Sequence, residues 1–413
     1  MNRSNLVTRA IVRAAMLASL LVVAIPNGHA QEKVRPEVGK PLQAAQDLMK
    51  ANKFKDALAK VREADAVSAK TPFEIYMVER MRASAATGAK EGDTAIKAYE
   101  AVVASGKAPP QDQVKIIEAL ATSYYNAKDY ASAIKWGARY FKEGGTGGQI
   151  RTLMIQSHFQ SGDFAASAKE SLSDIEADEK AGRPPAEDKL LLLANSYLRQ
   201  KNNTGYIATI EKLLNYYPKK SLWADVISRL QKKPGFSDRL SLDVYRLQLA
   251  TGNLATTNDY MEMAQLALQA GFAVEGKKVI DEGFNNGALG KGAEADRHKR
   301  LRDLAIKRVA AAEKAAASEL AEAEAAKDGN ALVRLGYNLV SSGQAAKGAE
   351  MIDAGIKKGG LKRPEDARLY LGMAYIQAGQ KTKGISILKS IRGYEGGIGD
   401  IANLWVLFAQ KSA

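Results

Sequence analysis

The hydrophobic pattern of this chain is helical rather than strand-like, and it is clearest between residues 330 and 389. Residues 335–352 read LGYNLVSSGQAAKGAEMI, and residues 371–388 read LGMAYIQAGQKTKGISIL, 36 positions later. In both runs an apolar stretch, a glycine turn and a second apolar stretch follow in the same order. This pattern predicts two helical hairpins, and a repeat of this period predicts that each hairpin stacks on its neighbours.

The position where the two helices of a hairpin cross can be followed upstream from these copies. It is Gly336 and Gly372 in the clear copies, because a small residue lets two helix axes approach closely. The corresponding upstream residues are Ala45, Ala83, Ala121, Ile155, Ala194, Ile227 and Ala264. Successive crossing positions lie 33 to 39 residues apart, except for one interval of 72 that holds a repeat without a clear motif. About ten hairpins are therefore expected.

Two segments depart from the hairpin pattern. Residues 293–328 are rich in Ala, Glu, Lys and Arg and have few large apolar side chains after Val309. They predict a long, partly solvated helix, either a projecting rod or part of a degenerate hairpin. Residues 398–409 (IGDIANLWVLFA) are strongly apolar and predict a helix that caps the last hairpin, with an exposed docking helix as the alternative.

The two clear copies resemble the tetratricopeptide repeat (TPR) family. The second copy places Leu371-Gly372 and Tyr375 where the family has L-G-x2-Y, and Gly384 and Leu388 where it has A-x3-F. The resemblance implies an all-α fold, a right-handed α-solenoid of about ten TPR-like hairpins with a C-terminal capping helix. It also implies that the chain works by binding along a surface.

The first thirty residues have the layout of a secretory signal peptide. Three arginines precede the apolar run 14–25, and Gly28 and Ala30 place small residues at positions −3 and −1 of a cut. Twelve apolar residues are too few to span a bilayer, although an uncleaved membrane anchor is the alternative. Cleavage after Ala30 predicts a periplasmic or secreted protein, with an N-terminal TPR-like array over 31–292, the charged helix over 293–328 and a C-terminal pair plus cap over 329–413.

The composition narrows the range of partners. Without residues 1–30 the chain has 57 Lys and Arg against 46 Asp and Glu, a net charge of +11, and it contains no Cys. Disulfide and thiol chemistry are therefore excluded. A basic but well-mixed surface favours contact with an anionic envelope polymer or a membrane surface, whereas nucleic acid is not expected for an exported protein.

The sequence contains no recognisable catalytic or metal-binding arrangement, so no enzyme activity, cofactor or metal is predicted. Only His158 and His298 follow the predicted cut, and they are too few for a histidine-rich zinc site. His158 takes the place of a repeat tyrosine in hairpin packing, and His298 is expected in solvent or against an anion. The run 144–148 (GGTGG) lacks the GK[ST] ending of a phosphate loop, and the acidic run 174–179 lacks a calcium-loop glycine.

The TPR resemblance implies that the first helix of each hairpin lines a concave surface. The positions that face it lie about three before, one after, and four to five after the crossing residue. In the N-terminal array these positions hold Arg80, Ser84, Thr122, Tyr125, Asn126, Gln156, Phe159, Gln160, Asn195, Arg199, Ser228, Gln265 and Gln269. In the two C-terminal copies they hold Tyr337, Met373 and Gln377. The peptide-carboxylate clamp of some TPR domains is not reproduced, because its first positions hold Leu42 and Gln46.

A row of Asn and Gln side chains can satisfy the backbone of an extended peptide, since each amide both donates and accepts hydrogen bonds. The leading hypothesis is therefore a non-enzymatic periplasmic scaffold or adaptor that binds a protein or extended peptide in its concave groove. The alternatives are an inner face that is merely solvated, and an accessory of polysaccharide or peptidoglycan export that contacts an anionic polymer. A third hypothesis is an enzyme of unrecognised type. Its active site would need carboxylates from different repeats to face each other in a pocket.

Overall fold

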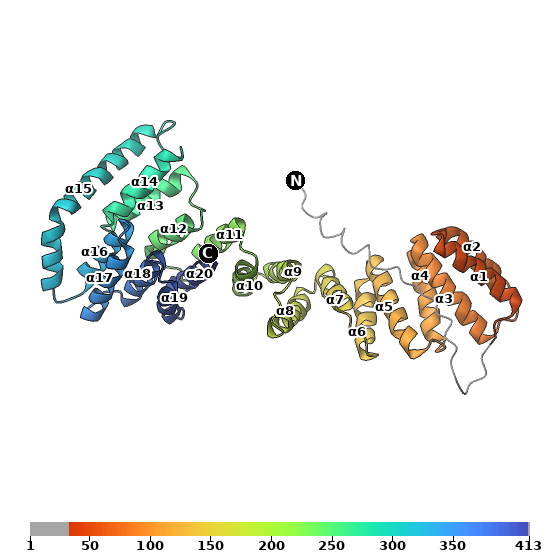
Figure 1. The fold of residues 1–413 in the computed structure, drawn as a ribbon. Coiled ribbons are helices and arrows are strands. Elements are labelled where there is room, and N and C mark those ends of the chain that lie inside the picture. The colour runs from red at the N-terminus through yellow and green to blue at the C-terminus, as the bar shows by residue number, and fades with distance from the viewer. Residues whose placement is uncertain (1–32, 412–413) are drawn as a thin grey trace. The chain divides into compact units, whose positions relative to one another are not determined.

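The computed structural model describes residues 33–411, and over this range the chain is all-α, with no strand. Consecutive helices pack as hairpins, as the repeat pattern predicts (Figure 1). The chain divides into two compact units, Met1–Ile150 and Arg151–Ala413. The predicted signal peptide lies outside the described residues.

The first unit contains three hairpins. Its helices are α1 (Pro36–Lys50), α2 (Phe54–Asp65), α3 (Pro72–Ala89), α4 (Gly92–Ala104), α5 (Pro110–Asn126) and α6 (Tyr130–Lys142). The crossing residues Ala45, Ala83 and Ala121 are fully buried, as a close approach of the paired helices requires. Helix α3 starts with a capping box, in which Thr71 and Glu74 satisfy each other's backbone N–H groups.

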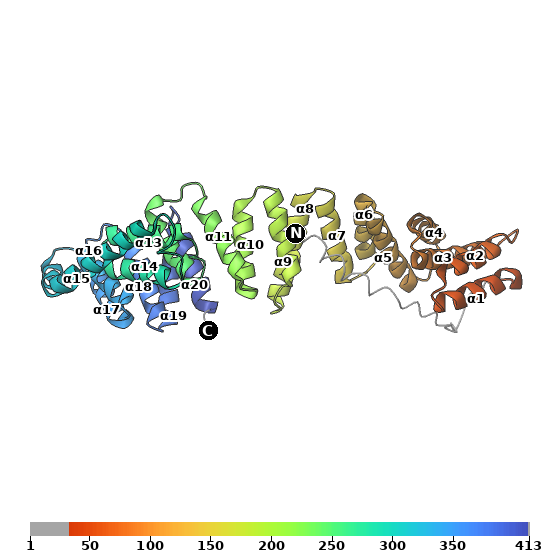
Figure 2. The same ribbon diagram turned by 90° about the horizontal axis from the view of Figure 1, so that it is seen from above.

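The second unit contains the remaining helices, except that the first three residues of α7 belong to the first unit. They are α7 (Gly148–Gln160), α8 (Phe164–Lys180), α9 (Glu187–Arg199), α10 (Asn203–Tyr216), α11 (Lys220–Gln231), α12 (Ser241–Ala250), α13 (Thr257–Gln269), α14 (Ala273–Asn285), α15 (Ala295–Ala325), α16 (Asn330–Ser341), α17 (Ala345–Lys358), α18 (Pro364–Gln377), α19 (Lys381–Ser390) and α20 (Ile398–Lys411). Helices α8 to α11 follow one another side by side (Figure 2).

Glycine sets the crossing of α16 and α17. A Cβ atom on Gly336 would lie 2.8 Å from the backbone oxygen of Gly348, and one on Gly348 would lie 2.6 Å from a methyl group of Val340. Neither separation is compatible with van der Waals contact, so only glycine permits this approach. Gly372 and Gly384 have the same relationship in α18 and α19, where a Cβ on Gly384 would lie 2.7 Å from the Gly372 oxygen.

The apolar C-terminal helix α20 is buried, and it does more than cap the last hairpin. It packs against α18 and α19, and also against α10 and α12, which precede it by more than 140 residues. Arg239 donates to both carboxylate oxygens of Asp366 at 2.6 and 2.7 Å, and Lys233 lies 2.8 Å from Asp400. The end of the chain therefore closes onto α10–α12.

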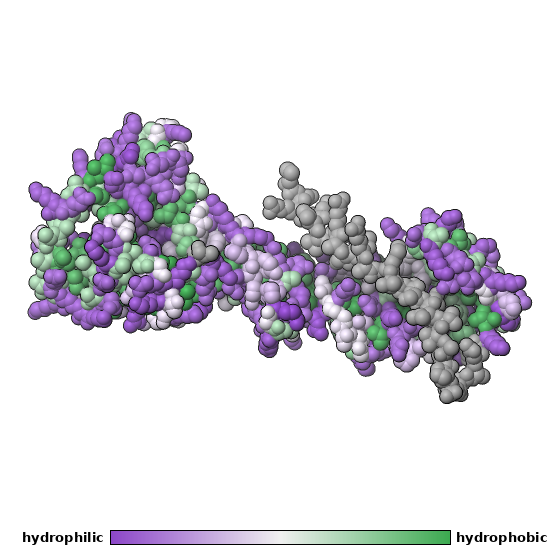
Figure 3. Space-filling view, in the orientation of Figure 1, coloured by the Kyte–Doolittle hydropathy of each residue, from purple (hydrophilic) through white to green (hydrophobic). Residues whose placement is uncertain are grey.

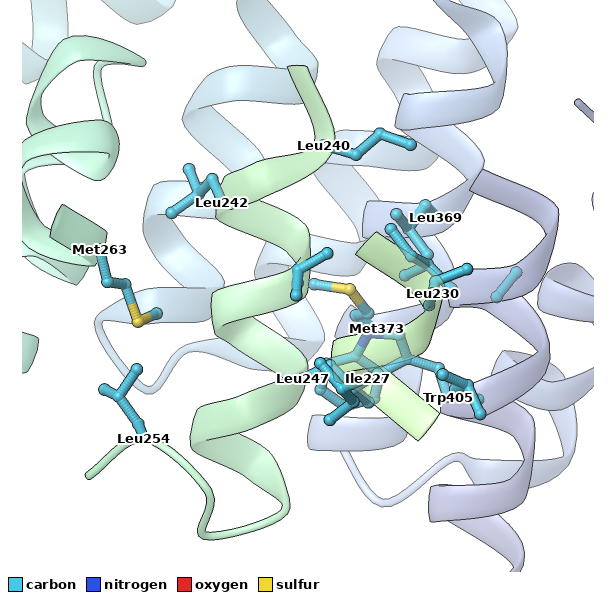
Figure 4. Packing of buried hydrophobic residues seen from close by; sticks show 14 of the residues in the cluster. Ile227, Leu230, Leu240, Leu242, Leu247, Leu254, Met263, Leu369, Met373 and Trp405 are labelled. Carbon is cyan, nitrogen blue, oxygen red and sulfur yellow. The ribbon is translucent and has the colours of Figure 1, made fainter. Parts of the chain in front are cut away.

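This closure builds a core from helices far apart in the sequence. Side chains of α11 and α12, such as Leu230 and Leu247, meet Leu369 and Met373 of α18 and Trp405 of α20 (Figure 4). Met373 is 0 % exposed and Tyr337 is 2 % exposed. The prediction that these two residues line an open groove is wrong. Side chains of α11 and α12 surround Met373, and Arg246 of α12 covers the ring of Tyr337 together with Phe272 and Tyr370.

The Ala/Glu/Lys-rich segment forms one long helix, α15, which packs against α13, α14 and α16. Within residues 33–411, no helix is long and apolar enough to cross a membrane.

Candidate functional site

In the first unit, Arg80 forms an ion pair and a hydrogen bond with neighbouring side chains. Its guanidinium lies 3.0 Å from the carboxylate of Asp112 at the start of α5, and it donates to the Tyr76 hydroxyl at 3.2 Å. This ion pair joins α3 to α5, which are the first helices of successive hairpins. The charge of Arg80 is therefore already partly neutralised within the unit.

The other predicted residues of the first unit are also mostly engaged within it. The hydroxyls of Ser84 and Thr122 donate to backbone carbonyls four residues earlier, at 3.2 and 2.9 Å. Tyr125 is half-buried, packs edge-on against Tyr130, and burial raises its pKa. Asn126, the last residue of α5, is exposed. This unit offers few side chains to a ligand.

In the second unit, predicted residues of α7 and α9 come together around Phe164 at the start of α8. The ring of Phe159 meets the ring of Phe164 edge-on, with centroids 5.3 Å apart. The guanidinium of Arg199 lies 4.8 Å from the centroid of the same ring, a cation–π geometry. Gln160 and Asn195 are exposed and Gln156 is half-buried. Three helices thus present an aromatic pair, a cation and amides in one place.

Two leucines that were not predicted complete this surface. Leu191 and Leu198 are each 40 % exposed, and they lie three before and four after the crossing residue Ala194. These are positions that the TPR resemblance assigns to the concave surface, and Asn195 lies between them in the sequence. The sequence signal for Leu191 is the run LLLL at 190–193, which supplies more leucines than one buried stripe of a helix requires.

The first helices α9 and α11 each carry an exposed cation without a matching acid. Arg199 and Lys232, the residue that follows α11, are both exposed, and no carboxylate among residues 33–411 pairs with either. The four ligand-facing positions of α9 hold Leu191, Asn195, Leu198 and Arg199, none of them acidic. This face therefore combines exposed apolar area with unpaired cations.

The last two predicted residues lie apart from this surface. Gln265 is half-buried and Gln269 is exposed on α13, which packs against α12, α14 and α15. The structure does not bring them together with α7 and α9. Ser228 of α11 is half-buried.

The two histidines occupy structural positions. His158 is half-buried and lies 3.5 Å from both Asp163 and Glu170. His298 is 3 % exposed, and its Nδ1 accepts a hydrogen bond from the Gly290 N–H at 3.1 Å. The expectation that His298 faces solvent or an anion is wrong, because it lies on the packed side of α15.

The acidic run of α8 is neutralised by basic residues nearby. Lys189 bridges Asp174 and Asp178 at 2.7 and 2.9 Å, and Lys212 lies 2.7 Å from Glu179. In the part of the chain that the structure describes, no three His, Cys, Asp or Glu side chains are grouped as a metal site would require.

Comparison with known proteins gives a match to one family. The model of the tetratricopeptide repeat matches residues 190–220, which form α9, α10 and the loop after them, and residues 366–394, which form α18 and α19. The comparison with curated protein sequences finds no match.

Several solved structures are similar at low identity. The apo form of RapI aligns with 12 % identity and a TM-score of 0.28, covering 66 % of this chain and 98 % of that chain. The TPR domain of P58(IPK) aligns with 11 % identity and a TM-score of 0.24, covering 91 % of this chain and 99 % of that chain. Yeast Tom70 aligns with 10 % identity and a TM-score of 0.23, covering 90 % of this chain and 95 % of that chain. Two hairpins of the chain therefore match the tetratricopeptide repeat model, within an array of helices that pack as successive hairpins.

Proposed function

We propose that this chain is a periplasmic adaptor without enzymatic activity, which binds an extended segment of another protein on the surface formed by α7, α9 and α11. The observation that carries the proposal is the exposure of Leu191 and Leu198 at the ligand-facing positions of α9. The tetratricopeptide architecture supports a protein-binding role in general, and the exposure of these leucines supports our choice of this surface.

The two leucines set a spacing for the ligand. Seven residues of α-helix separate them, which corresponds to about 10 Å along α9. Apolar side chains three residues apart on an extended polyproline-type peptide are separated by about 9 Å, so two of them reach both leucines. Burying a leucine against such a side chain contributes about 1.5–3 kcal/mol for the full side chain.

The polar residues around the leucines suit the rest of such a peptide. The amides of Gln160 and Asn195 are exposed, and each can both donate to a peptide carbonyl and accept from a peptide N–H. Arg199 and Lys232 favour a carboxylate side chain on the ligand. The preferred ligand is therefore an extended segment with two apolar side chains and at least one acidic residue.

Selection from a displayed library of random peptides tests this function. Peptides selected on the wild-type protein should be apolar and acidic, and fluorescence anisotropy should show Kd at least about tenfold higher for Leu191→Ser/Leu198→Ser, since two apolar contacts are lost. The matched control is Ile75→Ser, which removes an equally exposed apolar side chain from α3. Peptides that bind the double variant as tightly as wild type would show that this surface is not the site.

A further inference from the structure

The long helix α15 is fixed to the second unit along one side only. His298, Leu301 and Ala305 are buried on that side. Arg302 secures the contact with α14, because its Nε donates to Asp281 at 2.8 Å and its guanidinium lies 4.8 Å from the centroid of the Phe284 ring. The first half of α15 is therefore held in a defined orientation, with its other side facing outward.

The outward side of this half carries cations that have no partner. Arg300, Lys307 and Arg308 are exposed, and no acidic side chain among the described residues pairs with them. They lie four before, three after and four after Leu304, so they surround it on the helix surface. Leu304 itself is 43 % exposed. In Figure 3 the surface over this end of α15 is mainly hydrophilic, with small hydrophobic areas.

This arrangement of charges does not stabilise α15 itself. Residues 295–308 contain six Lys and Arg and only two acids, Asp296 and Asp303. The N-terminal end of a helix favours anions, and like charges on neighbouring turns repel one another. An exposed leucine among unpaired cations gains stability only when a partner supplies both negative charge and an apolar environment.

We propose that the first half of α15 binds the headgroups of anionic phospholipids, with Arg300, Lys307 and Arg308 on the phosphates and Leu304 at the boundary with the acyl chains. Interfacial helices combine these two contacts. A polyanionic sugar offers the charge without an apolar layer, so it leaves Leu304 in water. The lipid surface accounts for both kinds of side chain.

Co-sedimentation with vesicles tests the proposal on the purified full-length processed protein. Wild type should bind vesicles that contain phosphatidylglycerol and not vesicles of phosphatidylcholine alone. Arg300→Gln/Lys307→Gln/Arg308→Gln should bind the anionic vesicles about 100-fold more weakly, because each cation near such a surface contributes about fivefold. Its matched control is Lys97→Gln/Lys135→Gln/Lys169→Gln, which removes three exposed lysines elsewhere and should bind almost as wild type.

A second comparison separates a lipid from a soluble polyanion. Leu304→Ser should weaken binding to anionic vesicles about threefold or more and leave binding to dextran sulfate unchanged. Equal vesicle binding by wild type and the α15 triple variant, or no effect of Leu304→Ser on vesicles, would overturn the proposal. Far-UV circular dichroism melts of all variants confirm that they are folded. The Leu191→Ser/Leu198→Ser variant should bind vesicles as wild type does, so this result is independent of the peptide surface.

Discussion

Arg246 of α12 forms a bidentate ion pair with Glu275 of α14 in the interior of the second unit. Its Nε and Nη2 atoms donate to the two carboxylate oxygens at 2.8 and 2.7 Å, and its Nη1 donates to Asp243 at 2.8 Å. The side chain of Arg246 is only 3 % exposed. One cation thus neutralises two acids that are otherwise buried.

Three aromatic rings enclose the same guanidinium. Its carbon lies 4.8, 4.3 and 5.0 Å from the ring centroids of Phe272, Tyr337 and Tyr370. These rings belong to the N-terminus of α14, to α16 and to α18, so a single arginine on α12 links three later hairpins. Burial raises the pKa of both Tyr337 and Tyr370, so both hydroxyls are neutral at physiological pH.

Replacement of Arg246 by Met should strongly destabilise the second unit. The substitution keeps much of the apolar volume but leaves Glu275 and Asp243 buried without a cation, which costs about 3–5 kcal/mol. Urea unfolding followed by tryptophan fluorescence measures the loss, since Trp223 and Trp405 are buried in this unit. Arg199→Met, at an exposed arginine, is the control and should change stability by less than about 1 kcal/mol. A similar small effect at Arg246 would contradict this account of the ion pair.

The stability of the second unit should depend on pH through Asp243. Burial raises the pKa of this carboxyl from 3.8 to about 6, against the opposing effect of Arg246 and with Asp366 and Glu275 adding to the rise. Because the folded-state pKa is the higher one, the stabilising contribution is fully present below pH 3.8 and is lost as the pH rises through about 6. The free energy of unfolding should fall by up to about 3 kcal/mol across this window.

Asp243→Asn isolates that contribution. The amide keeps an acceptor for Arg246 and does not titrate, so the difference in stability between wild type and variant should change between pH 4 and pH 7. Thermal melts at several pH values in this range give the comparison. If the two proteins keep a constant difference in stability across the range, Asp243 does not titrate as stated.

The crossing of α16 and α17 should not tolerate a side chain at Gly336. Gly336→Val places a Cβ 2.8 Å from both the Gly348 oxygen and a carbon of Ile352, which forces the helices apart and should cost about 1–3 kcal/mol or more. Gly92→Ala is the control, because a Cβ there meets nothing within 4 Å, and it should be neutral or slightly stabilising. Equal melting temperatures for Gly336→Val and wild type would be incompatible with this packing.

The predicted export of the chain has a direct test. Mass spectrometry of the protein purified from the periplasmic fraction should identify an N-terminus at Gln31. Ala30→Asp should block cleavage, since position −1 requires a small neutral residue, and the larger precursor should remain with the membrane fraction. A mature protein that retains Met1 in the cytoplasmic fraction would refute the prediction.

The hairpins and their order follow from the sequence. The crossing residues Ala45, Ala83, Ala121 and Gly336 are buried where the repeat spacing places them, because a hairpin joins segments a few residues apart and its contacts are local. The repeat rule also identified Phe159 and Arg199, which meet around Phe164. The periodicity of the chain was sufficient for the hairpins, whereas Phe159 and Arg199 followed from the positions that the TPR resemblance implies.

The closure of the second unit depends on contacts that no local pattern encodes. Arg239 and Asp366 are 127 positions apart, and Lys233 and Asp400 are 167 apart. In the same unit Tyr337 and Met373 are buried, although their repeat positions alone predict an open face. Whether an inner face is filled depends on which distant helices pack beside it, so the tertiary structure alone shows that Leu191 and Leu198 remain exposed while Met373 does not.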